Sequence, residues 1–157
     1  MIINTQVYGM RESFIASGYP KKSEIVEMDP NADYYPEALK RAKKLAACKP
    51  STGHDCFLKG IIVQADFIMS HGWWMQAMRY NRFDIVSSQS KEHNCEALYG
   101  HNDPDEVKIG DKLGARVTTN FLQLKTMYGQ RRTHRRQEWA EFCKWVESID
   151  VCELITR

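Results

Sequence analysis

Apolar and polar positions alternate along two stretches of the chain, and this period of two predicts β-strands. The first stretch covers residues 2–8 and ends at Gly9, and the second covers residues 57–69. In the second stretch the apolar side chains fall on one parity, at Phe57, Ile61, Val63, Ala65, Phe67 and Met69. Gln64 and Asp66 occupy the other parity, so we expect a long strand with one buried face.

Apolar residues spaced three and four apart predict a helix over residues 36–47. Pro36 lies at a favoured first-turn position, and Glu37 complements the positive end of the helix dipole. Residues 49–53 then break the helix, because proline disfavours a helical residue before it and glycine permits unusual dihedral angles. We therefore expect His54 in a turn.

The same spacing predicts three further helices after position 70. The first covers about residues 73–81, and the other two contain the apolar residues of positions 121–128 and 139–149. Thr118 or Thr119 is expected to cap the helix that contains Phe121.

Two stretches are predicted to be loops because polar and turn-forming residues dominate them. They are residues 18–34, apart from a brief strand at Ile25 and Val26, and residues 91–114. Together these elements predict an α+β fold, in which a small antiparallel or mixed sheet packs against helices. One domain over residues 1–157 is expected.

The composition suits such a domain, since 43% of the 157 residues are hydrophobic and 27% are charged. The net charge of +2 at pH 7 creates no global field that would favour nucleic acid. The five cysteines form no CxxC pair and their number is odd, which is typical of reduced thiols. Neither a signal-peptide pattern nor an apolar run of about 20 residues is present. We therefore expect a soluble, cytoplasmic protein without a membrane partner.

Side chains that can bind a phosphate gather between positions 76 and 90. The hydroxyl-rich loop consists of Ser87, Ser88, Gln89 and Ser90. Arg79 and Arg82 precede it, and guanidinium groups bind phosphate through a planar fork of donors. Gln76 lies three positions before Arg79, so the two side chains are expected to share one helix face. The alternative is that the serines serve only turns and helix caps.

Arginines are densest in residues 130–137, which read Gln-Arg-Arg-Thr-His-Arg-Arg-Gln. This segment has three interpretations: a solvated connector between helices, a phosphate site that the serine loop completes, or a surface for a nucleic-acid backbone. The five histidines show neither HxxxH nor HxH spacing, so no metal site is expected. No Ser-His-Asp order identifies a hydrolase.

The order of these motifs resembles the core of the flavin-dependent thymidylate synthases. Gly53-His54, a strand, Gln76-x-x-Arg79 and then residues 87–93 follow one another along the chain. The family shows a Gly-His turn, a strand, a helix with Gln-x-x-Arg-His-Arg and a loop reading Asn-Glu-x-Ser-x-Arg-Tyr. The order carries the resemblance, because each short match is weak alone.

The resemblance continues towards the C-terminus and covers about residues 36–147. The stretch Thr119-Asn120-Phe121-Leu122 resembles the family's Asn-bearing helix, and residues 131–138 resemble its Ala-Gln-x-Glu-Ile-Arg segment.

The chain also departs from the family pattern. It has Arg79-Tyr80-Asn81 where the family has Arg-His-Arg, and Arg82 replaces a lost cation only with a change of register. Ser87-Ser88 stand in place of Asn-Glu, and Glu92-His93 stand in place of Arg-Tyr. The residues that carry over directly are Gln76, Arg79 and Ser90. The chain is expected to be shorter than these enzymes, as in a divergent relative that a phage genome could encode.

The resemblance implies reductive methylation of dUMP, with hydride from reduced FAD, NADPH as reductant and carbon from methylenetetrahydrofolate. It implies cofactor contacts from His54, Gln76, Arg79, Arg82 and Asn120. Substrate contacts are implied for Gln76, Arg79, Ser87, Ser88, Gln89, Ser90, Arg131 and Gln137. The catalytic candidate is Ser90, which is expected near the pyrimidine.

The resemblance also implies a homo-oligomer, either a tetramer or a dimer, because the family's pockets lie between subunits. Two alternatives remain open. One is a non-catalytic nucleotide-binding module, such as a viral protein that sequesters a nucleotide signal. The other is a nucleic-acid-binding protein that uses residues 131–136.

Overall fold

The computed structural model describes residues 1–29, 35–49 and 52–156. The elements in chain order, with η marking 3-10 helices, are β1 (Ile2–Tyr8), α1 (Met10–Ala16), η1 (Tyr19–Lys21), α2 (Tyr35–Ala46), η2 (Cys56–Gly60), β2 (Ile62–Ser70), α3 (His71–Ala77), β3 (Asp84–Ser88), α4 (Lys91–Tyr99), η3 (Pro104–Glu106), β4 (Lys112–Asn120), α5 (Phe121–Arg131), α6 (Gln137–Glu147) and η4 (Cys152–Leu154). These elements confirm the predicted α+β class.

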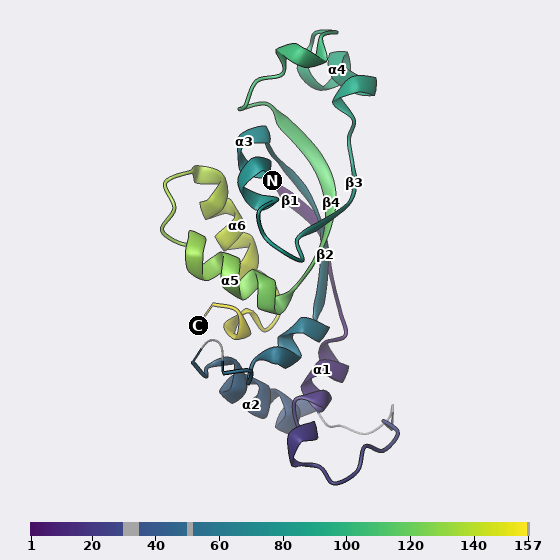
Figure 1. The fold of residues 1–157 in the computed structure, drawn as a ribbon, viewed down its shortest axis with the longest axis vertical. Coiled ribbons are helices and arrows are strands. Elements are labelled where there is room, and N and C mark those ends of the chain that lie inside the picture. The colour runs from purple at the N-terminus through teal and green to yellow at the C-terminus, as the bar shows by residue number, and fades with distance from the viewer. Residues whose placement is uncertain (30–34, 50–51, 157) are drawn as a thin grey trace.

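The four strands form one antiparallel sheet in the order β1-β2-β4-β3. Strands β2 and β4 pair along their whole length, from Ile62 opposite Asn120 to Ser70 opposite Lys112. Helices α5 and α6 lie along one face of the sheet, α4 projects at one end of the molecule, and α1 and α2 lie at the other end (Figure 1). Helix α4 and the pair α1 and α2 therefore lie far apart, with the sheet between them.

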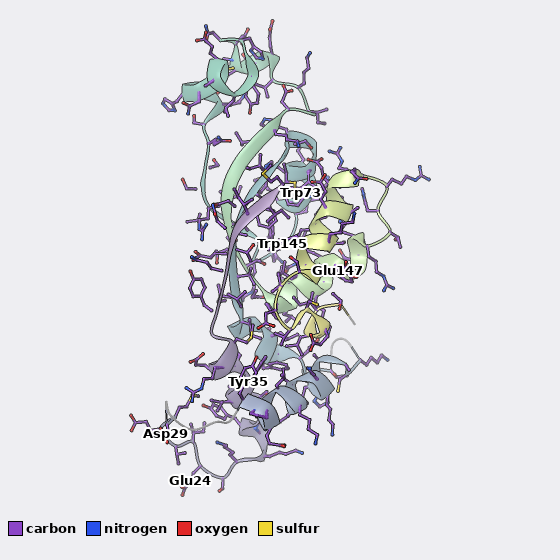
Figure 2. The ribbon with its side chains drawn as sticks, turned by 180° about the vertical axis from the view of Figure 1, so that it is seen from behind. Glu24, Asp29, Tyr35, Trp73, Trp145 and Glu147 are labelled. Carbon is purple, nitrogen blue, oxygen red and sulfur yellow. The ribbon has the colours of Figure 1, made fainter. Side chains whose placement is uncertain are left out.

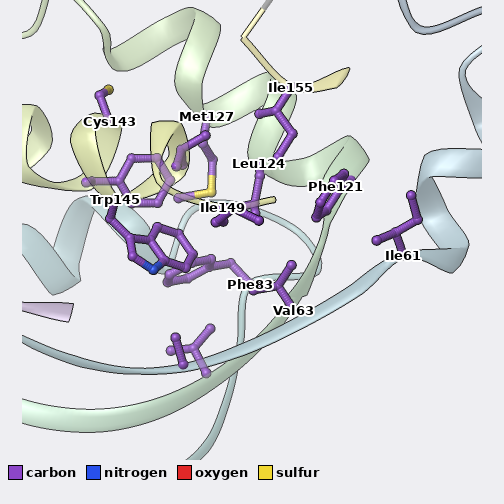
Figure 3. Close-up of a cluster of buried hydrophobic side chains, with 14 of the residues drawn as sticks. Ile61, Val63, Phe83, Phe121, Leu124, Met127, Cys143, Trp145, Ile149 and Ile155 are labelled. Atoms are coloured by element: carbon purple, nitrogen blue, oxygen red, sulfur yellow. The ribbon is translucent and has the colours of Figure 1, made fainter. Parts of the chain in front are cut away.

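Large aromatic side chains fill the space between the sheet and the helices. The ring of Phe67 on β2 lies 5.8 Å from Trp73 of α3, 5.3 Å from Phe83 and 5.1 Å from Trp145 of α6, measured between ring centroids. Figure 3 shows Trp145 and Phe83 in this cluster, beside residues of α5. Each buried side chain of this size contributes about 1.5–3 kcal/mol, so α3 and α6 are firmly attached to the sheet.

Several predicted elements are confirmed. The strand over residues 2–8 is β1, the helix over residues 36–47 is α2, and His54 lies in a turn. The two C-terminal helical patterns correspond to α5 and α6. No helix in the described part of the chain is long and apolar enough to cross a membrane.

The long strand begins later than the alternation predicts. Residues 56–60 form η2, and β2 starts at Ile62. The apolar residues Leu58 and Ile61 are both fully buried and lie three positions apart, which suits one turn of a 3-10 helix as well as a strand. The buried ion pair between Lys125 of α5 and Asp55, at 2.8 Å, holds this turn against α5.

The prediction of a surface loop over residues 91–114 is wrong. This stretch contains α4, η3 and the first residues of β4. Helix α4 has only one buried residue, Cys95, so it lacks the apolar stripe by which an amphipathic helix is recognised. The inward positions of β4 are the small residues Ala115, Val117 and Thr119, which give a weak strand pattern.

Three further features differ from the prediction. Asn120 rather than Thr118 or Thr119 caps α5, because its Oδ1 accepts a hydrogen bond from the backbone N–H of Gln123 at 2.9 Å. Both threonines belong to β4. The brief strand expected at residues 25–26 is absent from the described residues 22–29, and α1, for which the pattern offered no assignment, follows β1.

Candidate functional site

The end of α3 meets the connection between α5 and α6, and Tyr80 joins them. Its hydroxyl donates a hydrogen bond to Gln130 Oε1 at 2.9 Å and accepts one from Arg131 Nε at 2.7 Å. The Tyr80 ring also packs edge-on against Trp139, with 6.3 Å between centroids. Two segments about fifty residues apart in the sequence therefore form one corner of the molecule. We call Gln76, Arg79, Tyr80, Arg131 and Trp139 the corner site.

Arg131 presents a fixed guanidinium group at this corner. Its Cζ lies 4.6 Å from the centroid of the Trp139 ring and 5.4 Å from that of Tyr80, both within cation–π range. Only Nε forms a hydrogen bond, and among the described residues Nη1 and Nη2 have no partner. A guanidinium held in this way keeps two parallel N–H donors for an oxyanion.

Gln76 adds a fixed amide to the corner site. Its Oε1 accepts a hydrogen bond from Trp139 Nε1 at 2.8 Å. The amide nitrogen consequently keeps its two donors, and it has no hydrogen-bond partner within the described ranges. The side chain is half-buried, so its orientation is set by the protein rather than by water.

Arg79 does not share a helix face with Gln76, contrary to the prediction. Helix α3 ends at Ala77, and the amide of Tyr80 bonds to the Ala77 carbonyl oxygen at 3.0 Å in a turn. The packing of Tyr80 against Trp139 outweighs the helical tendency of this segment. Arg79 is exposed in the turn and forms no hydrogen bond or ion pair with another described residue.

The dense arginines of residues 130–137 divide into two kinds. Arg136 is structural: its Nη1 donates to Ser70 Oγ at 3.0 Å and to Glu138 Oε2 at 3.3 Å. The guanidinium lies so close to Gly72 that a Cβ there would approach its nitrogens to 2.8 Å. Arg132 and Arg135, in contrast, are exposed and form no ion pair in the described part of the chain.

Glu138 is ionised at the centre of this network. Burial alone would raise its pKa, but hydrogen bonds from the Ser70 hydroxyl, the Ser70 amide and Arg136 hold the pKa below its ordinary value. The network fixes the start of α6 to the start of α3. It thereby helps to hold Trp139 of α6 against Gln76 of α3.

His134 lies in sequence between Arg131 and Arg136, which are both half-buried. Burial lowers its pKa, and the positive charges of Arg131 and Arg136 lower it further. Its Nδ1 accepts a hydrogen bond from the backbone N–H of Arg136 at 3.1 Å, which requires the neutral ring. The imidazole therefore adds no positive charge at neutral pH.

The predicted serine loop has a different setting. Ser87 and Ser88 lie exposed on the edge strand β3. Gln89 Oε1 accepts a hydrogen bond from the Gly114 amide at 2.7 Å. Ser90 caps α4, accepting from the His93 N–H at 3.3 Å, and its hydroxyl lies 2.9 Å from His93 Nδ1. The capping alternative therefore describes Ser90, and no hydrogen bond of the described residues links this segment to the corner site.

The other predicted site residues lie on separate elements of the fold. His54 is exposed in its turn, and Asn120 is buried as the cap of α5. Arg82 is exposed with φ of 60°, at the reversal into β3. Gln137 is exposed as the first residue of α6. Of the predicted set, Gln76 and Arg131 are brought together through Trp139, and Arg79 and Arg82 lie close to them only in sequence, on either side of Tyr80.

A groove of about 310 Å³ lies where α3 meets residues 90–111, a segment that we call the arm. Its lining consists of His71, Met75, Lys91, Val107, Lys108 and Ile109. The two lysines supply positive charge that the sequence analysis missed, because each stands alone in a polar stretch. Tyr80 and Trp139 were also missed, although the aromatic character of both segments could have suggested a support for arginine.

No protein-family model matches the sequence, and no curated protein matches it. The fold is similar to a crystal structure of thymidylate synthase X (ThyX) from Helicobacter pylori with FAD and dUMP, with a TM-score of 0.76 and 10% identity over 99% of this chain and 96% of that one. A second structure of H. pylori flavin-dependent thymidylate synthase ThyX, complexed with FAD and dUMP, gives a TM-score of 0.74 and 10% identity over 94% and 93%.

These similarities confirm the predicted core fold. They also correct one expectation, since the chain covers nearly the whole length of both H. pylori chains and is not short relative to them. The predicted shortness assumed that segments of this fold were missing. At 10% identity, the likeness concerns the fold alone.

Proposed function

We propose that this protein binds dUMP through the corner site and acts as a flavin-dependent, thymidylate synthase-like enzyme of the cytoplasm. The observation that carries the proposal is the Arg131 guanidinium, which the rings of Trp139 and Tyr80 and the Tyr80 hydroxyl hold in place while both terminal nitrogens stay free. A nucleotide phosphate matches this fork of donors. The fold, which resembles that of proteins solved with FAD and dUMP, supports the same assignment.

The residues present suit the phosphate groups of dUMP and of FAD. Arg79 and Arg82 are exposed cations next to the corner, and Lys91 and Lys108 line the groove at the arm. When bound, FAD reduced by NADPH supplies hydride while methylenetetrahydrofolate supplies the carbon. The protein's own part is to orient dUMP and to neutralise its phosphate, which Arg131 binds.

Gln76 and Trp139 also contribute to nucleotide binding at the corner site. The free amide donors of Gln76 would hydrogen-bond the nucleotide, while Trp139 keeps water from one side of the guanidinium. With water excluded, the charge interaction between Arg131 and a phosphate is stronger than it would be in bulk solvent.

A second copy of the chain would complete the site. Apolar side chains on α3, after it and on β3 face solvent, with exposed fractions of 64% for Met75, 65% for Met78 and 57% for Val86. Such clustered exposure is typical of an interaction surface. We propose a homo-oligomer, a tetramer or dimer, in which a partner brings its segment 87–90 to the corner site. Ser90 would then lie near the pyrimidine, and a protein that sediments only as a monomer would contradict this arrangement.

Calorimetric titration with dUMP tests the site. The substitution Arg131→Gln should weaken binding about 30-fold, or about 2 kcal/mol, because it removes a charged hydrogen-bonding partner. Arg132→Gln is the matched control, since Arg132 is the next residue and carries the same charge without the aromatic support. Equal affinities of the two variants would show that Arg131 does not bind the phosphate.

Absorption spectroscopy and NADPH oxidation test the activity. A flavin band in the purified protein, and oxidation of NADPH that dUMP stimulates, are the expected results. A colourless protein that does not respond to added FAD would contradict the enzyme assignment. Binding of dUMP without either signal would favour the non-catalytic nucleotide-binding alternative.

One observation favours that alternative. Tyr80 stands where the family has histidine, and its hydroxyl is engaged by Gln130 and Arg131. The residue therefore supports the site rather than facing a ligand.

The exposed Arg132 and Arg135 favour the other candidate, nucleic-acid binding. A gel-retardation assay that shows no salt-sensitive binding would exclude it.

A further inference from the structure

A second cleft lies at the other end of the molecule, between α1, η1 and α2. Its volume is about 460 Å³, which falls in the range of small-molecule sites, and its lining includes Ile15, Tyr19, Lys22, Val26, Ala38 and Arg41. Figure 2 shows Tyr35, the first residue of α2, far along the molecule from Trp73 of α3. The cleft is therefore separate from the corner site.

The cleft has an apolar floor. Ile15 of α1 and Ala38 of α2 are both buried, with exposed fractions of 8% and 3%. The side chains of Val26 and Met28 form an apolar wall, and the ring of Tyr19 also lines the space. An aromatic ring and a thioether are favourable neighbours for a flat, unsaturated ligand.

A fixed guanidinium borders this floor. Arg41 Nε donates to Ser17 Oγ at 3.0 Å and Nη2 donates to the Phe14 carbonyl oxygen at 2.9 Å. Gly18 lies directly under the group, where a Cβ would be 2.9 Å from Cζ. Nη1 has no hydrogen-bond partner among the residues described, so a pre-oriented donor remains at the cleft.

The charges of the lining favour an anion. Lys21 and Lys22 add two exposed ammonium groups, and Lys22 Nζ lies 5.8 Å from the centroid of the Tyr19 ring. With Arg41 they outnumber the two carboxylates of the lining, Glu27 and Glu37. Neither lysine forms an ion pair in the described ranges. The positive charge at the mouth of the cleft is therefore available to a ligand.

We propose that this cleft binds a small organic anion with a flat apolar body, of the aromatic carboxylate class. The apolar body would lie on Ile15 and Ala38 beside Tyr19, and the carboxylate would meet Arg41 and Lys22. This binding is independent of the nucleotide site, because the two share no residue.

Calorimetric titration with 2-naphthoate, and with the neutral 2-naphthamide as its matched probe, tests the proposal. We expect 2-naphthoate to bind one site per chain and the amide to bind about tenfold more weakly. Val26→Trp should abolish both signals by filling the cleft from its exposed wall, without disturbing the core. Equal binding of acid and amide would overturn the proposal.

Charge variants locate the site. Lys22→Glu should weaken 2-naphthoate binding about tenfold, whereas Lys40→Glu should leave it unchanged. Lys40 is exposed on α2 outside the cleft, so both variants change the net charge equally and neither touches the core. Arg131→Gln should also have no effect. Equal losses from Lys22→Glu and Lys40→Glu, or a loss in Arg131→Gln, would contradict binding in this cleft.

Discussion

The corner site and the arm both carry cations of the proposed nucleotide site, but they rest on different foundations. Arg131 lies on Trp139, which is fully buried and whose ring centroid is 4.9 Å from that of Trp73. In the arm, all of whose residues the structure describes, Cys95 is the only buried one. One group of cations is thus fixed to the core, and the other is held by a few surface contacts.

The arm is attached to the start of α3 through Tyr99, Ile109 and Asp111. The amides of His71 and Gly72 donate to the carbonyl oxygens of Asp111 and Ile109 at 3.0 and 2.9 Å. His71 Nε2 and Tyr99 Oη lie 3.1 Å apart. Segments with few buried apolar contacts open at a lower free energy than the core. The corner site is therefore pre-organised by the core, whereas the arm opens locally at a lower free energy.

The largest expected effect comes from removing the support of the corner site. Trp139→Ala should lower the free energy of unfolding by about 4 kcal/mol, because it deletes a fully buried aromatic side chain. The matched change in the arm, Cys95→Ala, should cost about 1 kcal/mol. Urea denaturation monitored by circular dichroism measures both. Equal losses would show that the arm is as well packed as the corner.

Much of the fold could be predicted from local pattern, and the reason is visible in particular elements. Helix α2 has an apolar stripe, with Ala38, Ala42 and Ala46 buried, so its period was clear. Helix α4 buries only Cys95, and its ends are set by the Ser90 cap and by Gly100 in the left-handed region. Such a helix is specified by its caps rather than by its period, which is why it was predicted to be a loop.

The site was less predictable because its contacts are long-range. The motifs pointed to Gln76, Arg79 and Arg131 separately, but nothing local indicates that Tyr80 would hold Arg131. Tyr80, which departs from the family motif, is the residue that joins the end of α3 to the end of α5. In the same way, Arg136 looked like its neighbours in sequence, and only its contact with Ser70 shows that it is structural.

A medium effect is expected from the network that fixes α6 to α3. Glu138→Gln should cost about 2 kcal/mol at pH 7, because Arg136 and the Ser70 amide lose a charged acceptor. The pKa of Glu138 is lowered in the folded protein, so its contribution is complete above the ordinary value of 4.5 and is lost as the pH falls through the folded pKa. The difference between wild type and variant should therefore shrink below pH 4.5. A difference that is the same at pH 7 and pH 3 would contradict this role.

A smaller, local effect is expected in the arm. Ser90→Ala removes the cap of α4 and should cost about 1 kcal/mol of local stability, because the His93 amide loses its acceptor. Hydrogen exchange should accelerate across residues 91–99 while the melting temperature stays within error. Ser88→Ala is the control, since that hydroxyl is exposed on β3 and caps nothing. A large fall in melting temperature would mean that the arm unfolds together with the core.

The smallest effect is on the pKa of His134. It tests whether the phosphate of dUMP binds at the corner site. The folded pKa of His134 lies below the ordinary value of 6.5 because of burial and the charges of Arg131 and Arg136, so stability decreases slightly as the pH drops through 6.5. A phosphate bound at Arg131 would offset those charges and raise the pKa of His134. NMR titration of the imidazole C–H signals of His134 measures this pKa. We expect the rise on addition of dUMP in the wild type and not in Arg131→Gln. An unchanged pKa at saturating dUMP would contradict a phosphate bound at Arg131.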